Sequence, residues 1–482
     1  MNQRESSGIA GLDEVLSGGF IAGRSYLISG PPGTGKTTIG WHFLGAAPEP
    51  DPVTLFITFG ESEVELRDNA RRSGFDPDGT VFLDLSPSSE LFAKSQTYDI
   101  FSASEVEREP TTRLIVDAVE RLKPCRVFID SMTSLRYLTT DDQEFRRTAL
   151  SFVRFLVSHG AVVLMTSESS PERPDDDLRF LVDGVIEVAL GARNRTIRVT
   201  KFRGSDFRSG PHTIKLDASG ATVYPRLIPE RFGASFDPSV LSSGLPAFDA
   251  LLHGGIERGT VTLVTGPTGV GKSTLGMQFA NAAAMQGQRT AVYTFDERRE
   301  TLVRRCRSVQ IPVDTMLATG TLRVLELEAL RFGADEFANL VRADIEDNGT
   351  RIVMIDSVSG YRLAVAGDDL VERLHGLCRY LENVGVTVLL INELQDVLSF
   401  RISETGISYL ADNVVYVRYL ERSDGQRSEL IRGVGVLKKR LSGFENTVRE
   451  FRITPSGLQI GEPLVGILTP IVGRDSVFDT AS

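Results

Sequence analysis

Apolar residues along this chain fall in short runs rich in β-branched residues, and longer stretches with helical spacing separate these runs. Short apolar runs bounded by turn residues are typical of strands buried on both faces of a parallel sheet. Such runs occupy 25–30, 54–59, 126–131, 162–167 and 184–190 in the first half, and 260–266, 289–295, 351–357, 386–392 and 413–419 in the second. Helical spacing begins at Thr37 and again at Glu144. The pattern predicts an α/β protein with mostly parallel, twisted sheets flanked by helices, in which ligands bind at the carboxyl ends of the strands.

The two halves of the chain also repeat each other residue by residue. The segment SGIAGLDEVLSGGFIAGRSYLISGPPGTGKTT at 7–38 is matched by SGLPAFDALLHGGIERGTVTLVTGPTGVGKST at 243–274, with a constant offset of 236 residues. A repeat of this length is a whole domain rather than the roughly 20 to 50 residues of a solenoid unit. We therefore predict two tandem domains, 1–230 and 231–482, joined by a connector within the proline-containing stretch 224–244.

Each half carries a phosphate-binding signature directly after its first predicted strand. GPPGTGKT and GPTGVGKS both match the pattern G-x-x-x-x-G-K-[ST] between a strand and a helix. Glycines let such a loop wrap closely around phosphates, and its N–H groups and its lysine favour negative charge. The predicted nucleotide-binding residues are Gly30, Pro31, Pro32, Gly33, Thr34, Gly35, Lys36, Thr37 and Thr38, and in the second half Gly266, Pro267, Thr268, Gly269, Val270, Gly271, Lys272, Ser273 and Thr274.

A divalent cation accompanies phosphates at such sites, and it needs a hydroxyl and a nearby carboxylate. Thr37 and Ser273 supply the hydroxyls. Asp130 and Asp356 are the first charged residues after the third apolar run of each half, so they stand at a strand end. These four residues are the predicted Mg²⁺ ligands, and a structural helix N-cap is the alternative for the two aspartates.

Hydrolysis or phosphoryl transfer needs a further carboxylate that polarises the attacking oxygen. Twenty-five residues after each P-loop lysine, the sequences TFGESE and TFDERR place Glu61 and Glu297 at matching positions, with Asp296 adjacent in the second half. We predict a catalytic role for these three acids. Ordinary solvated loop acids are the alternative.

The composition narrows the class of protein. With 41% hydrophobic and 24% charged residues, the chain can fill the cores of folded domains, which excludes a disordered or fibrous protein. The apolar runs are shorter than the roughly 20 residues that cross a bilayer, and the first residues form no secretory signal, so we expect a cytoplasmic protein without a membrane partner. The net charge of −11 argues against a nucleic-acid partner.

The doubled P-loop, the lead-in SGxxxxD followed by GG, the acid after TF and the IDS sequences together resemble the KaiC family of RecA-like ATPases. The resemblance covers nearly the whole chain. It implies a homo-oligomer, a hexamer of two stacked rings that binds ATP between neighbouring protomers, hydrolyses it slowly and autophosphorylates through its second domain. It also implies that a Lys-x-Arg pair of each domain reaches the neighbour's phosphates. Lys201 with Arg203 and Lys438 with Arg440 are these pairs, and a solvated charged strand is the alternative.

Two departures from the family pattern affect what the resemblance implies. The family has two adjacent acids after the TF strand in both domains, whereas Gly60 precedes Glu61 here, so we expect the first site to be slow or altered. The family's neighbouring Ser and Thr phosphoacceptors correspond here to Ser408 and Tyr409, with Ser403 and Thr405 nearby. Ser408 is the predicted acceptor, and an ordinary loop or helix-cap hydroxyl is the alternative.

The sequence therefore predicts a KaiC-like ATPase with Ser/Thr autokinase activity in its second domain, a nucleotide-driven signalling or timing hexamer that acts on a protein partner. One alternative is a RecA- or DnaB-like DNA-dependent ATPase, although the chain lacks a zinc ribbon, a helix-hairpin-helix linker and a basic tail. The other alternative is a nucleotide-gated scaffold with little turnover, which Gly60 favours.

Overall fold

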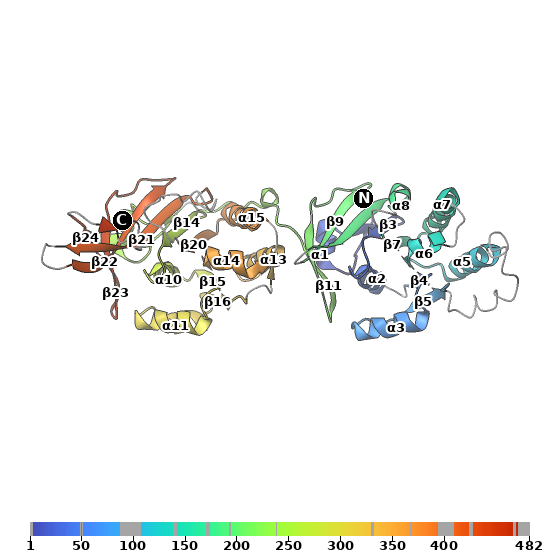
Figure 1. Ribbon diagram of the computed structural model, residues 1–482, viewed down its shortest axis with the longest axis horizontal. Helices are drawn as coiled ribbons and strands as arrows, with labels where there is room; N and C mark the ends of the chain where they lie inside the picture. Colours follow the sequence, from blue (N-terminus) through green and yellow to red (C-terminus); the bar gives the residue numbers. More distant parts are fainter. Residues whose placement is uncertain are drawn as a thin grey trace, which may run out of the picture. The chain divides into compact units, whose positions relative to one another are not determined.

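The structure is a computed structural model of the chain. It describes residues 3–48, 50, 52–86, 108–137, 142–169, 174–191, 194–237, 239–328, 332–366, 369–393, 409–423, 428–465 and 469–470. The chain divides into two compact units, Met1–Arg226 and Leu227–Ser482. Each unit is built around its own sheet, which helices flank (Figure 1).

The sheet of the first unit has nine strands, six of them parallel. Their bounds are β3 (Ser25–Ser29), β4 (Thr54–Thr58), β5 (Thr80–Asp84), β6 (Arg126–Asp130), β7 (Val162–Ser167), β8 (Gly184–Leu190), β9 (Arg195–Phe202), β10 (His212–Asp217) and β11 (Gly220–Tyr224). The strand order is β11-β10-β9-β8-β3-β7-β6-β4-β5, in which β8 to β5 are parallel and β9, β10 and β11 extend the edge in antiparallel fashion. One strand, β7, separates the P-loop strand β3 from β6, which ends at Asp130.

The second unit repeats this arrangement. Its strands are β14 (Val261–Gly266), β15 (Arg289–Thr294), β16 (Leu322–Glu326), β18 (Thr350–Asp356), β20 (Thr387–Glu393), β21 (Asn413–Ser423), β22 (Ser428–Lys439), β23 (Arg449–Thr454) and β24 (Gly457–Pro463). They lie in the order β16-β15-β18-β20-β14-β21-β22-β23-β24, and a further strand, β25 (Thr469–Pro470), pairs with β21. Read from β24 to β16, this is the order that the first sheet has from β11 to β5, so equivalent strands can be compared directly.

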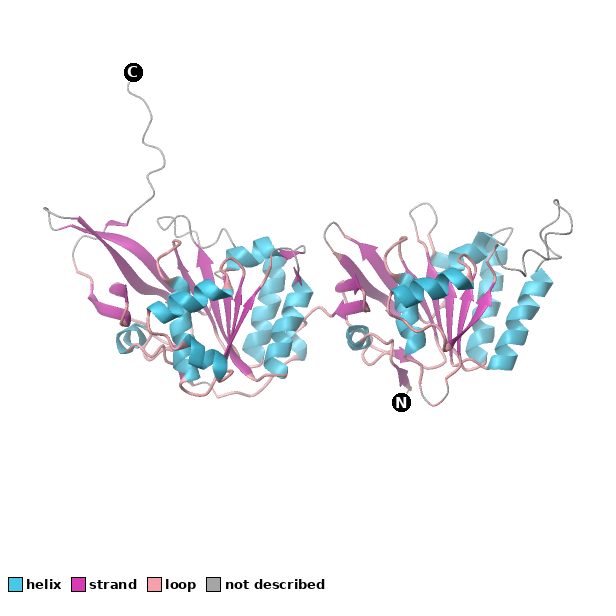
Figure 2. Cartoon of the chain, turned by 90° about the horizontal axis from the view of Figure 1, so that it is seen from below, coloured by secondary structure: helices cyan, strands magenta, loops and turns pink. Residues whose placement is uncertain are grey.

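Helices cover both faces of each sheet (Figure 2). In the first unit they are α1 (Ala10–Val15), α2 (Lys36–Gly45), α3 (Glu63–Arg72), α5 (Arg108–Leu122), α6 (Met132–Tyr137), α7 (Asp142–Ser158) and α8 (Asp176–Leu181). In the second unit they are α9 (Pro246–Leu251), α10 (Lys272–Ala284), α11 (Arg299–Ser308), α12 (Val313–Ala318), α13 (Ala334–Glu346), α14 (Val358–Ala364) and α15 (Leu370–Asn383).

The two-sided cover explains why the central parallel strands are mostly apolar. Successive strand residues point to opposite faces, and in β3 Tyr26 and Ile28 join one core cluster while Leu27 joins the other. In β14, Leu263 and Val264 divide between two clusters in the same way. Because both faces are buried, no polar alternation is left in these strands.

The structure confirms the predicted fold class and places a strand at each of the ten predicted runs. The antiparallel strands β9, β10 and β11 and their counterparts β22, β23 and β24 were not predicted. In β9, for example, buried and exposed residues alternate from Ile197 to Thr200, a pattern typical of an antiparallel sheet with one face toward solvent. Among the helices that the structure describes, none combines the length and the apolar character needed to span a bilayer.

Candidate nucleotide-binding site

The P-loop of each unit connects the central strand to the helix behind it. In the first unit this loop and the first helical turn contain Gly30, Pro31, Pro32, Gly33, Thr34, Gly35, Lys36, Thr37 and Thr38, and the second unit has Gly266 to Thr274 at the same place. Gly35 immediately precedes α2 with φ 95°, and Gly271 precedes α10 with φ 110°. A side chain at either position would be strained. Glycine at these positions therefore allows the left-handed backbone that leads from the loop into the helix.

The P-loop lysines are buried, with 8% of each residue exposed. The amine of Lys36 donates to the carbonyls of Gly30 at 2.8 Å and Pro31 at 2.9 Å, and Lys272 donates to those of Gly266 and Pro267, both at 2.8 Å. Burial lowers the pKa of both amines, while nearby carboxylates raise it. Both cations are thus held inside the loop that surrounds them.

One carboxylate beside each lysine was missed by the sequence reasoning. Glu168 directly follows β7, Glu393 ends β20, and their charges raise the pKa of Lys36 and Lys272 respectively. The Glu393 carboxylate also accepts a hydrogen bond from the Thr268 hydroxyl of the P-loop. The repeat could have identified them, because in both halves a glutamate directly follows the fourth apolar run of the sequence.

The predicted metal ligands lie together in both units. The Thr37 hydroxyl donates to Asp130 at 2.7 Å, and Asp130 also accepts from Thr166 at 2.5 Å. In the second unit the Ser273 hydroxyl donates to Asp356, a buried residue whose pKa burial raises. A hydroxyl beside a carboxylate at the P-loop is an all-oxygen set, which fits Mg²⁺ bound together with phosphates. These residues would hold the cation, and their role stays a prediction.

The predicted catalytic glutamates stand in identical turns. Thr58 ends β4 and its hydroxyl donates to the Glu61 carbonyl at 2.7 Å, and Thr294 at the end of β15 does the same for Glu297 at 2.7 Å. The threonine of each TF sequence therefore fixes the turn that follows the strand. Desolvation raises the pKa of both glutamates, and the charge of Asp130 or Asp356 raises it further.

The partners of these two glutamates differ between the units. Arg305 of α11 forms an ion pair with Glu297 at 2.8 Å and lowers its pKa. The equivalent residue of α3 is Asn69, whose side chain forms a hydrogen bond with Glu61 and lowers the pKa of Glu61. A charged partner therefore holds the glutamate of the second unit, and a neutral partner holds that of the first.

Asp296 has no counterpart in the first unit, where Gly60 occupies its position. Its carboxylate accepts a hydrogen bond from the Ser357 hydroxyl at 2.5 Å, directly after the predicted metal ligand Asp356. A Cβ atom at Gly360 would lie 2.5 Å from an Asp296 carboxylate oxygen, so a larger residue at this helix position would displace that carboxylate. The first unit has Ser134 there instead, and a Cβ atom at Gly60 would lie 3.5 Å from its hydroxyl. In each unit one of these two neighbouring positions carries a side chain and the other is glycine, and the assignment is reversed between the units.

The structure places three of the four predicted in-trans cations against their own chain. The Lys201 amine donates to the carbonyls of Arg179 at 2.7 Å and Val182 at 2.6 Å, at the end of α8. Lys438 donates to the Ala411 carbonyl at 2.6 Å, and Arg440 forms an ion pair with Asp412 at 3.0 Å. Arg203 is exposed. Their reach into a neighbouring protomer stays a prediction.

The predicted phosphoacceptor Ser408 lies outside the described residues, as do Ser403 and Thr405. Tyr409, the first described residue after them, is 74% exposed. Phosphorylation of this segment stays a prediction.

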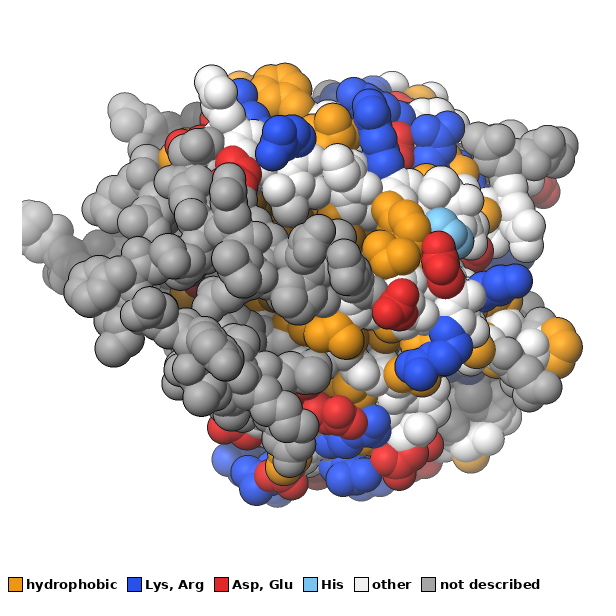
Figure 3. All heavy atoms as spheres, turned by 90° about the vertical axis from the view of Figure 1, so that its right-hand side faces the viewer, with side chains coloured by type: hydrophobic (Ala, Val, Ile, Leu, Met, Phe, Trp, Pro, Cys, Tyr) orange, Lys and Arg blue, Asp and Glu red, His pale blue; other side chains and the backbone are white. Residues whose placement is uncertain are grey.

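Figure 3 shows one face of the first unit, on which Lys and Arg side chains are interspersed with Asp and Glu side chains among the described residues. A duplex-binding surface would gather basic side chains into a continuous field. On this face the charges are mixed, in keeping with the net charge of −11.

Comparison with known proteins assigns both units to the same family. The family model described as "ATPase: KaiC" matches twice, at residues 5–228 and 241–465. The chain is 28% identical over 474 residues to the circadian clock oscillator protein KaiC of Parasynechococcus marenigrum, covering 95% of this chain and 90% of the relative. It is 28% identical over 468 residues to the protein of that description in Synechococcus elongatus, covering 94% and 88%. It is also 28% identical over 503 residues to the circadian clock protein KaiC3 of a Synechocystis species, covering 100% and 97%.

Proposed function

Because this chain belongs to the KaiC family of ATPases, we propose that both of its units bind Mg·ATP and that it hydrolyses ATP. The observation that carries the proposal is the repeated site. In each unit a buried P-loop lysine, a hydroxyl paired with an aspartate, and a glutamate of raised pKa meet at the carboxyl edge of one sheet. A structural role alone would not require both copies to keep this chemical arrangement at the same strand ends.

In this proposal the chain's own groups divide the work of hydrolysis. The P-loop N–H groups and Lys36 or Lys272 hold the outer phosphates, where negative charge gathers during the reaction. Glu61 or Glu297 accepts the proton of the attacking water as its oxygen bonds to the γ-phosphorus and ADP leaves. Mg²⁺, when bound, neutralises charge between the phosphates, and Thr37 with Asp130 or Ser273 with Asp356 would hold it.

Phosphate release by the full chain tests this proposal. We expect Lys36→Ala to abolish phosphate release by the first unit and Lys272→Ala to abolish that by the second. In the double variant the total rate should fall at least about 100-fold. Lys123→Ala, which removes an exposed lysine of the first unit, is the control and should keep the parent rate. A double variant with the parent rate would refute the proposal.

We also propose a homo-oligomer, a hexamer with ATP at the interfaces between protomers. Family membership supports it, and Arg203 is exposed, as contact with a neighbour's phosphates requires. In a Lys272→Ala background, chains with Lys36→Ala and chains with Arg203→Ala should each be inactive. Mixing them should restore turnover, because some interfaces then combine an intact lysine with an intact arginine. Failure of every mixture to recover activity, with hexamers present by light scattering, would place Arg203 outside the active site.

For the second unit we propose transfer of the γ-phosphoryl group to Ser408, with Ser403, Thr405 and Tyr409 as the other acceptors in reach of the same test. The names of the relatives as circadian clock proteins support a signalling or timing role, in which a protein partner reads the state of the ring. Peptide-level mass spectrometry after incubation with Mg·ATP should find phosphate on 403–409 that is absent from Lys272→Ala. An unmodified segment in an active ATPase would refute the kinase part.

A nucleotide-gated scaffold with little turnover is the second candidate. Gly60 favours it for the first unit, because that unit lacks the carboxylate that Asp296 provides. Assembly that depends on ATP, together with equal and very low phosphate release by the parent chain and by Glu297→Gln, would identify it. Stimulation of turnover by single-stranded DNA would instead favour a DNA-dependent ATPase.

A further inference from the structure

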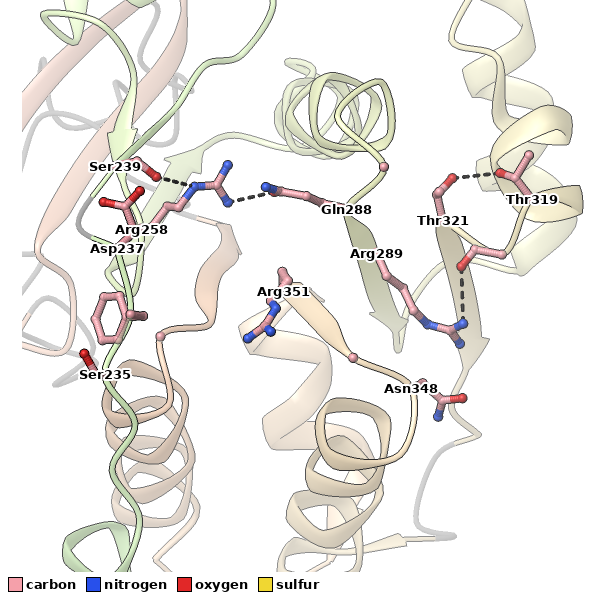
Figure 4. Close-up of a pocket in the computed structure, with 15 residues that line it drawn as sticks. Ser235, Asp237, Ser239, Arg258, Gln288, Arg289, Thr319, Thr321, Asn348 and Arg351 are labelled. Atoms are coloured by element: carbon pink, nitrogen blue, oxygen red, sulfur yellow. Dashed lines mark hydrogen bonds between the residues drawn. The ribbon is translucent and has the colours of Figure 1, made fainter.

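A cavity lies at the amino ends of the parallel strands of the second unit, whereas the P-loop lies at their carboxyl ends. It has a volume of about 730 Å³, and it is lined by the connector before β14 and by residues at the amino ends of the parallel strands. Figure 4 shows Arg258, Arg289 and Arg351 around it. Arg289 begins β15 and Arg351 is the second residue of β18, whereas Asp296 and Asp356 follow or end the same strands. At about 3.3 Å per residue, the cavity is about 20 Å from the nucleotide site.

The positive charge of this arginine pocket (Arg258, Arg289, Arg351) is balanced by little negative charge. Neutral oxygens orient two of the guanidinium groups: Arg258 donates to Ser239 at 2.9 Å and to Gln288 at 2.7 Å, and Arg289 donates to the Gly320 carbonyl at 3.2 Å. Arg351 is exposed and has no hydrogen-bond or ion-pair partner among the described residues. Asp237 is the single acidic residue in the lining.

Two further observations indicate that an anion would relieve this arrangement. Desolvation lowers the pKa of Arg258, and the nearby charge of Arg351 lowers it further, against the opposing effect of Asp237. The Nε atom of Arg289 is buried without a hydrogen-bond partner. Buried donors and clustered like charges each cost stability unless a negative group satisfies them.

The pocket belongs to the second copy alone. Counted back from matching P-loop and strand-end residues, the positions of Arg258, Arg289 and Arg351 are Ala22, Val53 and Cys125 in the first unit, so none of the three arginines is shared. Both units contain a P-loop. The arginines are therefore not a requirement of the nucleotide site that the two units have in common.

Beside the guanidinium groups, Phe236 supplies an apolar surface. Its ring lies directly against Gly259 and Gly385, where a Cβ atom would come within 2.6 Å and 2.5 Å of ring atoms. The residue nevertheless remains 41% exposed and belongs to the lining of the cavity. One side of the ring is thus packed on backbone, and its remaining surface is available to a ligand.

We propose that the arginine pocket binds a small organic diphosphate or triphosphate, with its phosphates at the guanidinium groups and its organic part against Phe236. Arginine is suited to phosphate because its planar fork donates two parallel hydrogen bonds. The cavity has the size of a small-molecule site, which is roughly 300 to 1,000 Å³. The binding is independent of the proposed ATPase activity, since no residue of the P-loop takes part.

Calorimetry on the full chain tests the assignment. In the Lys36→Ala/Lys272→Ala variant we expect inorganic pyrophosphate and ADP each to bind once per chain in this pocket, with ADP the tighter ligand because it also contacts Phe236. Adding Arg351→Gln should weaken both at least about tenfold, whereas Arg351→Lys should weaken them less because it keeps the charge and loses only the fork. Arg147→Gln, at an exposed arginine of the first unit, should change neither.

Two results would overturn the proposal. The first is anion binding that is unaffected by Arg351→Gln, with the variant's thermal midpoint unchanged. The second is an altered oligomeric state in Arg351→Gln without any change in anion affinity, which would show that an acidic protein surface occupies the pocket. Equal affinities for ADP and pyrophosphate would overturn the organic part of the assignment.

Discussion

Arg305 and Glu297 form an ion pair at 2.8 Å, and the residue that takes the place of Arg305 in the first unit is Asn69. The two glutamates otherwise stand in the same turn after the same strand. One helix position therefore decides whether the proposed base faces a full positive charge or an amide. The two sites should consequently differ in the pH range in which they work.

Replacing Arg305 should move the acid limb of ATP hydrolysis to higher pH. Desolvation raises the pKa of Glu297 above the ordinary value of about 4.3, and Arg305 lowers it. A glutamate accepts a proton only when it is ionised, so turnover falls as the pH drops through its pKa. In a Lys36→Ala background, Arg305→Asn should raise the midpoint of the acid limb, measured as kcat against pH.

The reciprocal variant provides the control for this shift. In a Lys272→Ala background, Asn69→Arg should lower the acid midpoint of the first unit, because a cation stabilises the ionised form of Glu61. Identical midpoints in all four chains would show that these glutamates do not set the pH dependence.

Removing the carboxylate charge should reduce turnover much more than it reduces nucleotide affinity. General-base catalysis contributes roughly 100- to 10,000-fold, so Glu297→Gln should lower kcat by at least about 100-fold in a Lys36→Ala background, with KM changed less than about threefold. Glu61→Gln in a Lys272→Ala background should act in the same direction. Glu300→Gln, at an exposed position of α11, is the matched control. A raised KM at constant kcat would instead identify Glu297 as a binding residue.

Introducing a carboxylate into the first site should help only when Ser134 is also replaced. The position of Gly360, which leaves space for the Asp296 carboxylate, carries Ser134 in the first unit. In a Lys272→Ala background we expect Gly60→Asp alone to turn over no faster than its parent, whereas Gly60→Asp/Ser134→Gly should exceed both. Steady-state phosphate release measures the difference. Equal rates in the single and double variants would show that Ser134 does not limit the position.

The helices behind the two P-loops should respond differently to the same substitution. A Cβ atom at Gly40 would lie 2.1 Å from the buried Phe128 ring, whereas at the equivalent Gly276 it would lie 2.9 Å from the flexible end of Met354. Gly40→Ala should therefore lower the free energy of unfolding by about 1–3 kcal/mol through overpacking. Gly276→Ala should change it by less than about 1 kcal/mol, because a gain in helix propensity offsets the small displacement.

Denaturant unfolding of the full chain, followed separately for the transition of each unit, checks this pair. Both variants keep the P-loop sequence itself. Equal losses in the two variants would mean that the Met354 side chain is held as firmly as the Phe128 ring.

The sequence was sufficient for the elements that depend on local pattern. Apolar runs such as 126–131 became strands because two covered faces require apolar residues at every position, and the duplication located both P-loops. The antiparallel strands β9 and β22 were not predicted, because their partly charged sequences resemble loops until a neighbouring strand pairs with them.

Contacts between distant segments could not be predicted in the same way. The pairing of Glu297 with Arg305 depends on the angle at which α11 leaves its turn, and the proximity of Gly60 to Ser134 depends on which two strands are neighbours. Glu168 and Glu393 could have been found from the repeat, since the same strand ends in glutamate twice. Their closeness to the P-loop lysines required the strand order.

The exchange between Asp296 with Gly360 and Gly60 with Ser134 also constrains how the two copies diverged. Aspartate at the first position together with serine at the second would force the carboxylate out of its hydrogen bond with Ser357. A chain with glycine at both positions has space for aspartate at the first position or for serine at the second. Single substitutions that avoid this overlap connect the two copies through that double-glycine chain, in which the loss of one side chain leaves space for the other.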